Sequence, residues 1–423
     1  MKKTLLALLA FILAAAWFLW PKHDGGPPPS QASLAMPAAE KIARGAYLAK
    51  AGDCMACHTV RGGASYAGGR ALQTPFGAVI SPNITSDTET GIGGWSADDF
   101  WNALHNGRSR DGRLLYPAFP YTNYTAVTRD DSDALYAFFR TIPAVRQVSR
   151  PHELRFPYNQ QAALAVWRAL YFKPAVFQPE AKQSAEWNRG AYLVQGLGHC
   201  SACHSSRNVL GGTDNGLSGG LVPVLGWYAP SLTSDAEAGL GDWQPDHIAA
   251  LLKTGISPRA TVFGPMAEVV RQSLQHLDDG DVRAMAAYLK TLPSPDGRPE
   301  PHERSKAPEA VAFLQAGAKI YKAQCAECHG GDGKGKPPHY PPLAGNRALT
   351  MDEAANPIRI VLNGGFPPGT AGNPRPYGMP PYSHVLDDVE TAAVVSYLRS
   401  AWGNNARPVT SLEVNRYRNV PLD

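Results

Sequence analysis

The chain reads Cys54-Met-Ala-Cys57-His58 at its first cysteines, and it repeats this C-x-x-C-H pattern as Cys200-Ser-Ala-Cys203-His204 and Cys325-Ala-Glu-Cys328-His329. These three stretches contain all six cysteines of the sequence. C-x-x-C-H is the attachment signature of c-type haem, in which the two thiols add to the vinyl groups and the histidine lies under the iron. The sequence therefore predicts three covalently bound haem c groups, with iron ligands His58, His204 and His329.

Two other chemistries use C-x-x-C pairs, namely zinc sites and redox-active dithiols. A structural zinc ion takes four ligands, commonly from two paired motifs, and three widely spaced motifs do not divide into such pairs. A redox dithiol is expected once, beside a βαβ pattern, and the sequence contains no evident pattern of that kind. Haem attachment is therefore the favoured interpretation.

Length and composition limit the architecture and the partners. The 423 residues are enough for about three domains, and the 41 Gly and 37 Pro favour loop-rich modules over long bundles. The formal net charge is +4, and no run of Lys and Arg suggests a nucleic-acid partner. We also find no Ser/His/Asp arrangement or nucleophile motif, so no catalytic residue is predicted.

The N-terminus is typical of an export signal. Lys2 and Lys3 precede an apolar run of 17 residues from Thr4 to Trp20, which is at the short end for a membrane span. The run is either an uncleaved anchor or a cleaved signal peptide. We favour the anchor, because no small-x-small cleavage site follows at the usual distance, and either reading places the bulk of the chain outside the cytoplasm.

Three repeats follow this segment. Residues 44–48 and 189–193 share the sequence RGAYL, each just before a cysteine pair, and the third repeat has GAKIY at residues 317–321. Helices are expected over residues 97–106, 131–141, 160–171, 245–254, 279–291 and 387–400. The tyrosines on the terminal helices are expected to pack on the N-terminal helix of their own repeat, namely Tyr136, Tyr288 and Tyr397.

Each repeat is a small, mostly helical module whose core needs the apolar macrocycle for stability. The expected organisation is a signal peptide or membrane anchor over residues 1–20, a linker over 21–38, a first domain over 39–150, a connector over 151–183, a second domain over 184–294, a linker over 295–308, a third domain over 309–405 and a tail over 406–423.

The environment of each iron follows from the same repeats. A proline carbonyl after each motif should accept the N–H of the haem histidine, and Pro82, Pro230 and Pro341 hold that place. A methionine on the opposite side of the iron raises the reduction potential and suits electron transfer. Met266 and Met379 are predicted as such ligands, because each lies beside Gly and Pro in a loop before the terminal helix of its repeat.

The first repeat lacks this methionine, and Phe119 occupies its place. Met55 lies between the linking cysteines, and Met36 precedes the module, so neither can substitute. His105 is a lone histidine on a predicted helix and is more often a core or surface residue than a ligand. The first haem is therefore expected to be five-coordinate or to have a ligand that the sequence does not identify.

Five stretches carry a family resemblance: residues 83–85 (NIT), 110–117 (RDGRLLYP), 187–193 (WNRGAYL), 196–200 (GLGHC) and 264–270 (GPMAEVV). With them, about residues 40 to 405 resemble the trihaem cytochrome c subunits of membrane-bound bacterial periplasmic dehydrogenases. The resemblance implies a mainly α fold of three tandem class-I cytochrome c domains. Members that serve flavin-type gluconate dehydrogenases carry Met where Phe119 stands, whereas Phe resembles the branch associated with molybdenum hydroxylases.

The resemblance also implies the function and the partners. Electrons would pass from a catalytic dehydrogenase subunit of the molybdopterin, flavin or quinoprotein type to membrane quinone or a terminal oxidase. The chain would lie on the periplasmic side of the bacterial inner membrane, attached through its N-terminal segment, and would not itself be an enzyme. The alternative is a peroxidase-like haem enzyme or ligand binder that uses an open first haem.

Overall fold

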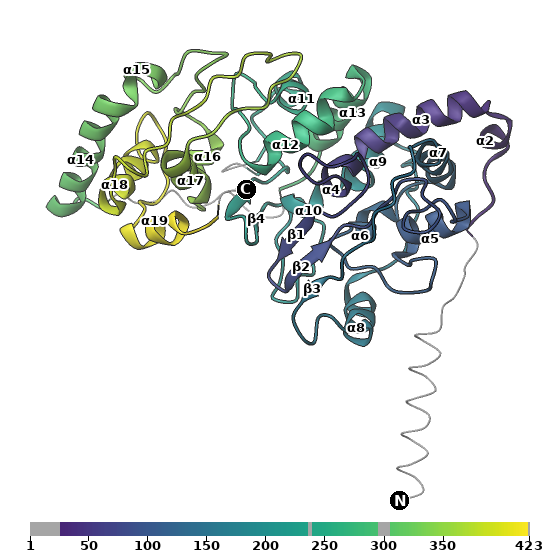
Figure 1. The fold of residues 1–423 in the computed structure, drawn as a ribbon. Helices are drawn as coiled ribbons and strands as arrows, with labels where there is room; N and C mark the ends of the chain where they lie inside the picture. The colour runs from purple at the N-terminus through teal and green to yellow at the C-terminus, as the bar shows by residue number, and fades with distance from the viewer. Residues whose placement is uncertain (1–25, 236–238, 295–304, 422–423) are drawn as a thin grey trace, which may run out of the picture. The chain divides into compact units, whose positions relative to one another are not determined.

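The computed structural model describes residues 26–235, 239–294 and 305–421 (Figure 1). The expected membrane anchor or signal peptide, residues 1–20, lies outside these residues, and so does most of the linker 295–308. The described chain forms two compact units. One contains the residues up to 49 together with 57–178, and the other contains residues 50–56 together with those from 179 onward.

Residues 26–178 are mostly helical and include one small sheet. In chain order the elements are α2 (Gln31–Ala35), α3 (Ala38–Ala51), α4 (Cys54–His58), β1 (Ala71–Thr74), β2 (Gly77–Ile80), α5 (Ala97–Asn106), α6 (Tyr121–Tyr124), α7 (Arg129–Phe139), β3 (Glu153–Leu154) and α8 (Gln161–Tyr171).

Residues from 179 onward belong to the other unit. We keep the names second domain for its part up to residue 294 and third domain for its part from residue 305. The second domain has α9 (Ala185–Gln195), α10 (Ser201–His204), β4 (Gly220–Val222), β5 (Trp227–Ala229), α11 (Pro245–Thr254), α12 (Pro265–Gln272), the 3-10 helix η1 (Leu274–His276) and α13 (Asp279–Lys290). The third has α14 (Pro308–Gln324), α15 (Ala326–His329), α16 (Arg347–Thr350), α17 (Ala355–Asn363), α18 (Asp388–Leu398) and α19 (Ser411–Arg418).

Two helices have the bounds that the sequence predicts, because local signals fix both of their ends. In α5 the side chain of Ser96 accepts a hydrogen bond from the N–H of Asp99, and the Asp99 carboxylate accepts one from the N–H of Ser96. Helix α11 begins at Pro245, whose missing N–H costs nothing at this position. Both helices end at a glycine in the left-handed conformation, Gly107 and Gly255.

One glycine in each domain lets the N-terminal helix cross the terminal helix at close range. A Cβ atom on these glycines would meet a carbonyl oxygen of the terminal helix at about 2 Å, far inside van der Waals contact. The pairs are Gly45 with Ala134 at 1.9 Å, Gly190 with Ala284 at 1.9 Å, and Gly317 with Ala393 at 2.1 Å. The same crossing in all three domains means that they share one helical scaffold.

An aromatic side chain four residues further along the terminal helix covers each glycine. Tyr288 and Tyr397 do so in the second and third domains, as predicted. In the first domain this residue is Phe138 rather than Tyr136. The prediction for Tyr136 was therefore wrong: its hydroxyl donates to the carbonyl of Trp95 at 2.6 Å, so it faces the other side of α7.

Two small antiparallel sheets are additions to the helical fold that the repeats do not predict. Strand β2 pairs with β1 on one side and with β3 on the other. Strand β3 lies in the expected connector, and Phe177 of the same connector donates its N–H to the carbonyl of Ala126. Residues 151–178 therefore pack on the first domain.

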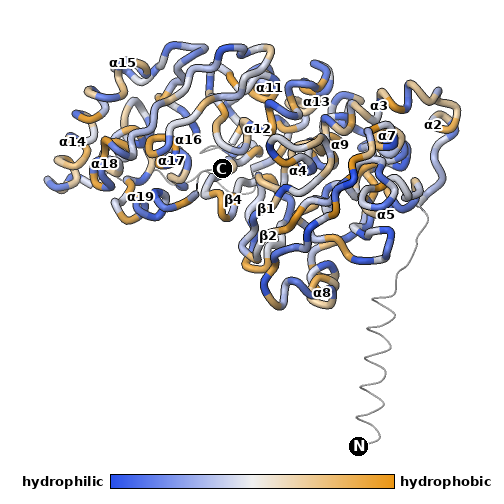
Figure 2. The backbone as a smooth tube through the Cα atoms, in the orientation of Figure 1, coloured by the Kyte–Doolittle hydropathy of each residue, from blue (hydrophilic) through white to orange (hydrophobic). Residues whose placement is uncertain are grey.

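Hydrophobic and hydrophilic segments alternate over short distances along the described chain (Figure 2). Within residues 26–235, 239–294 and 305–421, no helix is both long enough and apolar enough to cross a membrane.

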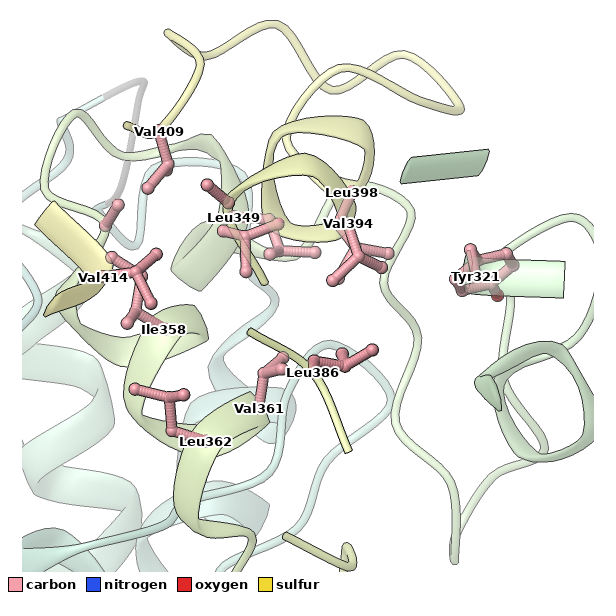
Figure 3. Packing of buried hydrophobic residues seen from close by; sticks show 13 residues of the cluster. Tyr321, Leu349, Ile358, Val361, Leu362, Leu386, Val394, Leu398, Val409 and Val414 are labelled. Carbon is pink, nitrogen blue, oxygen red and sulfur yellow. The ribbon is translucent and has the colours of Figure 1, made fainter. Parts of the chain in front are cut away.

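The core of the third domain gathers side chains from α14, α17, α18 and the segment after α18 (Figure 3). Ile358 and Leu362 of α17 and Val394 of α18 are almost fully buried, as are Val409 and Val414 further along. The expected tail, residues 406–423, thus includes a helix, α19, that belongs to this domain.

Candidate haem sites

Each C-x-x-C-H motif ends in a histidine whose ring is fixed by a backbone carbonyl. The distances between the histidine Nδ1 and the proline oxygen are 2.8 Å for His58 and Pro82, 2.6 Å for His204 and Pro230, and 3.1 Å for His329 and Pro341. The predicted hydrogen bond is therefore present three times. It orients the imidazole, makes it more basic and leaves Nε2 for a metal.

Burial favours the neutral form of all three histidines. It lowers the pKa of His58 and His329, and the bond to the proline carbonyl only partly opposes this effect. For His204, burial is the largest cause, the Pro230 carbonyl opposes it, and the positive charge of Arg347 adds to it, bringing the pKa to about 4. A neutral imidazole is the form that binds iron.

None of the six cysteines forms a disulfide bond. Burial raises the pKa of Cys200 to about 12 and the pKa of Cys325 to about 11. A raised pKa disfavours the thiolate that redox chemistry or metal binding would need at Cys200 and Cys325. Covalent bonds to an apolar macrocycle fit these positions better.

A zinc site fits poorly. Among the described residues no group of three or more His, Cys, Asp or Glu side chains is arranged to hold a metal ion. Structural zinc needs four ligands. The haem interpretation needs only one protein nitrogen and two sulfur atoms on one side of each macrocycle, which each motif supplies.

Sequence reasoning missed a second repeated element of geometry, a glycine that donates its N–H to the carbonyl of each haem histidine. The three pairs are Gly68 to His58 at 2.8 Å, Gly219 to His204 at 2.8 Å, and Gly335 to His329 at 2.9 Å. All three glycines have positive φ, and a Cβ on Gly68 would meet the Pro82 backbone at 2.4 Å. Alignment of the repeats did not reveal these glycines, because the number of residues between each glycine and its C-x-x-C-H motif differs from repeat to repeat.

The backbone of the first two domains supports the alignment of Phe119 with Met266. In each domain, the carbonyl of the glycine that ends the preceding helix accepts a hydrogen bond from a backbone N–H further along the chain. Gly107 accepts from Leu115 at 2.8 Å, and Gly255 accepts from Val262 at 2.9 Å. Phe119 and Met266 each lie four residues after the donor. Both side chains are half-buried, and the Phe119 ring lies against Tyr124.

The two candidate methionines lie in different local structures. Met266 is in the first turn of α12 and not in a loop, so that part of the prediction was wrong. The preceding Gly264 and Pro265, followed by Glu268, are a helix-start signal that could have indicated this. Met379 lies in extended backbone and exchanges two hydrogen bonds with Gly365.

His105 belongs to the core of the first domain. Its ring stacks on Trp101 with a centroid distance of 4.5 Å, and its Nδ1 lies 2.8 Å from the carbonyl of Thr125. Burial lowers its pKa, and the Thr125 carbonyl opposes that effect. These contacts give the imidazole a structural role, in agreement with the interpretation favoured from the sequence.

Tandem helical domains, each with a histidine–proline pair after two thiols, define a c-type cytochrome. The cytochrome c family matches residues 42–143, 188–293 and 314–402, which is more than half of the chain. The chain belongs to the cytochrome c family, and it carries covalently bound haem c.

Relatives over most of the length are subunits of dehydrogenases. The chain is 39% identical over 398 residues to the gluconate 2-dehydrogenase cytochrome c subunit of Pantoea cypripedii, covering 89% of each chain. It is 39% identical over 383 residues to the cytochrome c subunit of the quinone alcohol dehydrogenase of Gluconobacter oxydans, covering 86% of this chain and 79% of that one.

A third relative is a nicotinate dehydrogenase subunit of Pseudomonas putida. Identity is 42% over 371 residues, which cover 85% of this chain and 30% of that protein. The chain is thus an electron-transfer protein, and the alternative of a haem enzyme or ligand binder finds no support among these relatives.

Proposed function

We propose that the chain carries three haem c groups and passes electrons through them from a catalytic dehydrogenase subunit to membrane quinone or a terminal oxidase. The observation that carries this proposal is the threefold repetition of one geometry. Each C-x-x-C-H helix ends in a histidine that is bonded to a proline carbonyl and to a glycine N–H.

The residues have the following roles in this proposal. Thioether bonds to haem form at Cys54, Cys57, Cys200, Cys203, Cys325 and Cys328. The irons are bound by His58, His204 and His329, with Met266 and Met379 as the second protein ligands of the second and third irons. When bound, the haems supply one-electron redox chemistry at potentials that the axial ligands tune.

The partner and the location follow from the relatives and from the N-terminal sequence. The relatives named above are subunits of dehydrogenases for gluconate, alcohol and nicotinate, which supports a catalytic dehydrogenase partner here. Phe119 and the similarity to a subunit of an enzyme for an N-heterocyclic acid favour a molybdenum-hydroxylase partner over the flavin and quinoprotein types. The apolar segment of residues 4–20 supports export and attachment to the periplasmic side of the inner membrane.

A haem count tests the number of haems. We expect three haems per chain in the purified holoprotein by pyridine haemochrome absorbance and intact mass. Replacing the cysteine pair of any one motif with alanine, for example Cys200→Ala with Cys203→Ala, should leave two. A variant that keeps the wild-type count would refute haem attachment at that motif.

A reduction assay tests the direction of electron flow. Addition of substrate to the chain with its dehydrogenase partner should reduce all the haems, whereas substrate without the partner should reduce none. Rapid reaction of one haem with cyanide or carbon monoxide, together with turnover of peroxide, would instead favour the haem-enzyme alternative.

A further inference from the structure

Arg347 begins helix α16 of the third domain and reaches into the second domain, within one compact unit. Its Nη1 donates a hydrogen bond to the carbonyl of Ser231 at 3.2 Å. Its guanidinium lies over the indole of the buried Trp243, with 5.0 Å between Cζ and the ring centroid. The side chain is therefore held by two contacts with a neighbouring domain.

The carbonyl that Arg347 binds is adjacent to the one that orients the second haem histidine. Pro230 accepts from His204 Nδ1 at 2.6 Å, and Ser231 is the next residue. One short segment thus connects the iron ligand on one side with a cation from the third domain on the other. In the first domain the equivalent Asn83 is bonded within its own domain, by its N–H to Ser149 and by its amide to the carbonyl of Val145.

The Arg347 charge persists in this place. Burial lowers the pKa of its guanidinium to about 10, so the group stays protonated at neutral pH. The side chain is partly buried, and a charge in such surroundings acts over a longer distance than one in water.

We propose that the third domain raises the reduction potential of the second haem through the positive charge of Arg347. This inference rests on the proposed function, because it requires haem at Cys200 and Cys203. Reduction of an iron from Fe³⁺ to Fe²⁺ adds one electron and lowers its positive charge. A fixed cation nearby therefore favours the reduced state, and its removal disfavours that state.

The consequence concerns the order of electron transfer. Only a chain in which the second and third domains are docked has this cation beside the segment that orients His204. The docked arrangement then makes the second haem a better electron acceptor than its own domain would make it.

The test is a spectroelectrochemical titration of the full-length holoprotein. For Arg347→Gln we expect one of three one-electron midpoints to fall, by about a tenfold change in the reduction equilibrium, which corresponds to ~59 mV. Arg347→Lys keeps the positive charge and should stay close to wild type.

Two controls separate charge from docking. Asn356→Ala removes the pair of hydrogen bonds between Asn356 and the backbone of Tyr228, at 2.9 and 2.8 Å, which also join the third domain to the second. Arg259→Gln removes a cation whose Cζ lies 6.0 Å from the Trp243 ring. Both variants should move that midpoint less than Arg347→Gln does.

The outcomes are distinct. A fall of one midpoint in Arg347→Gln, restored in Arg347→Lys, supports the inference. Unchanged midpoints, an equal shift of all midpoints, or the same shift in Asn356→Ala would overturn it. The proposed trihaem function is judged separately, by whether the wild-type protein shows three midpoints at all.

Discussion

The first and second domains hold their haem histidines in the same way and differ in the side chain at the place where we propose the second iron ligand. His58 and His204 both bind a proline carbonyl through Nδ1, and the backbone carbonyls of both histidines accept from a glycine N–H. The backbone then brings Phe119 to the place of Met266. The comparison teaches that domains with the same crossing of N-terminal and terminal helices can present different side chains at this place: Phe119 precedes the short helix α6, whereas Met266 lies in the first turn of α12.

The largest expected effect comes from exchanging these two side chains. Phe119→Met should add a third Met–iron charge-transfer band, and Met266→Phe should remove one of the two bands of the wild type. Because methionine raises the potential, Met266→Phe should also lower one midpoint by an amount on the order of 0.1 V. Absorption of the oxidised protein and a redox titration measure both changes.

Met285 supplies the control for the exchange, since it is buried in α13 and packs in the core. Met285→Leu should leave every Met–iron band unchanged. Three bands in the wild type would show that the first haem already has a methionine ligand, and the contrast between the domains would then disappear.

The second prediction concerns what the domains share. Gly45→Val and Gly190→Val should each destabilise their domain by about 2–3 kcal/mol or more, because the new side chain meets a carbonyl of the terminal helix. Denaturant unfolding of the holoprotein, followed at the haem absorbance, measures the loss. The two variants should behave alike, since the crossing is the same in both domains.

Gly280 in α13 is the matched control, because nothing lies within 4 Å of a Cβ at this position. Gly280→Ala should stabilise the second domain slightly, by about 0.5–1 kcal/mol, through a lower entropy of the unfolded chain. Equal losses at Gly190 and Gly280 would mean that the helix crossing is not what requires glycine.

The smallest effect concerns the segments that follow the terminal helices, residues 151–178 in the first domain and α19 in the third. Hydrogen bonds from Asn415 and Arg418 of α19 lower the pKa of Asp388. Since the folded state lowers this pKa, the contribution is present above pH ~4 and is lost as the pH falls through the folded value. Asp388→Asn should therefore cost about 0.5 kcal/mol at pH 7 and nothing at pH ~2.

Calorimetry of wild type and Asp388→Asn at both pH values measures this difference. Glu309 lies in the first turn of α14 and is the control: Glu309→Gln should show no comparable change. A difference between wild type and Asp388→Asn that persists at pH ~2 would mean that the aspartate acts other than through its charge.

Local signals made much of the scaffold predictable. Helix α5 begins at a capping box and α11 begins at a proline, and each of the two helices ends at a glycine, so residues inside or next to each helix determine its bounds. The histidine–proline bonds were predictable because the repeats place one proline after each motif. The sequence pattern did not show whether Tyr136 or Phe138 packs on the N-terminal helix α3. The two residues lie on different sides of α7, and only the packing of the helices decides which side faces α3. Strands of two to four residues leave too short a pattern to recognise.

The sequence by itself determined the chemistry, because haem attachment depends on cysteines and a histidine that are adjacent in the chain. It also determined that the first repeat lacks the methionine of the second, because that comparison needs only alignment. The tertiary structure alone decided that Arg347 lies beside Ser231, 116 positions earlier in the chain. No local pattern specifies such a contact, since it arises only when two separately encoded domains pack together.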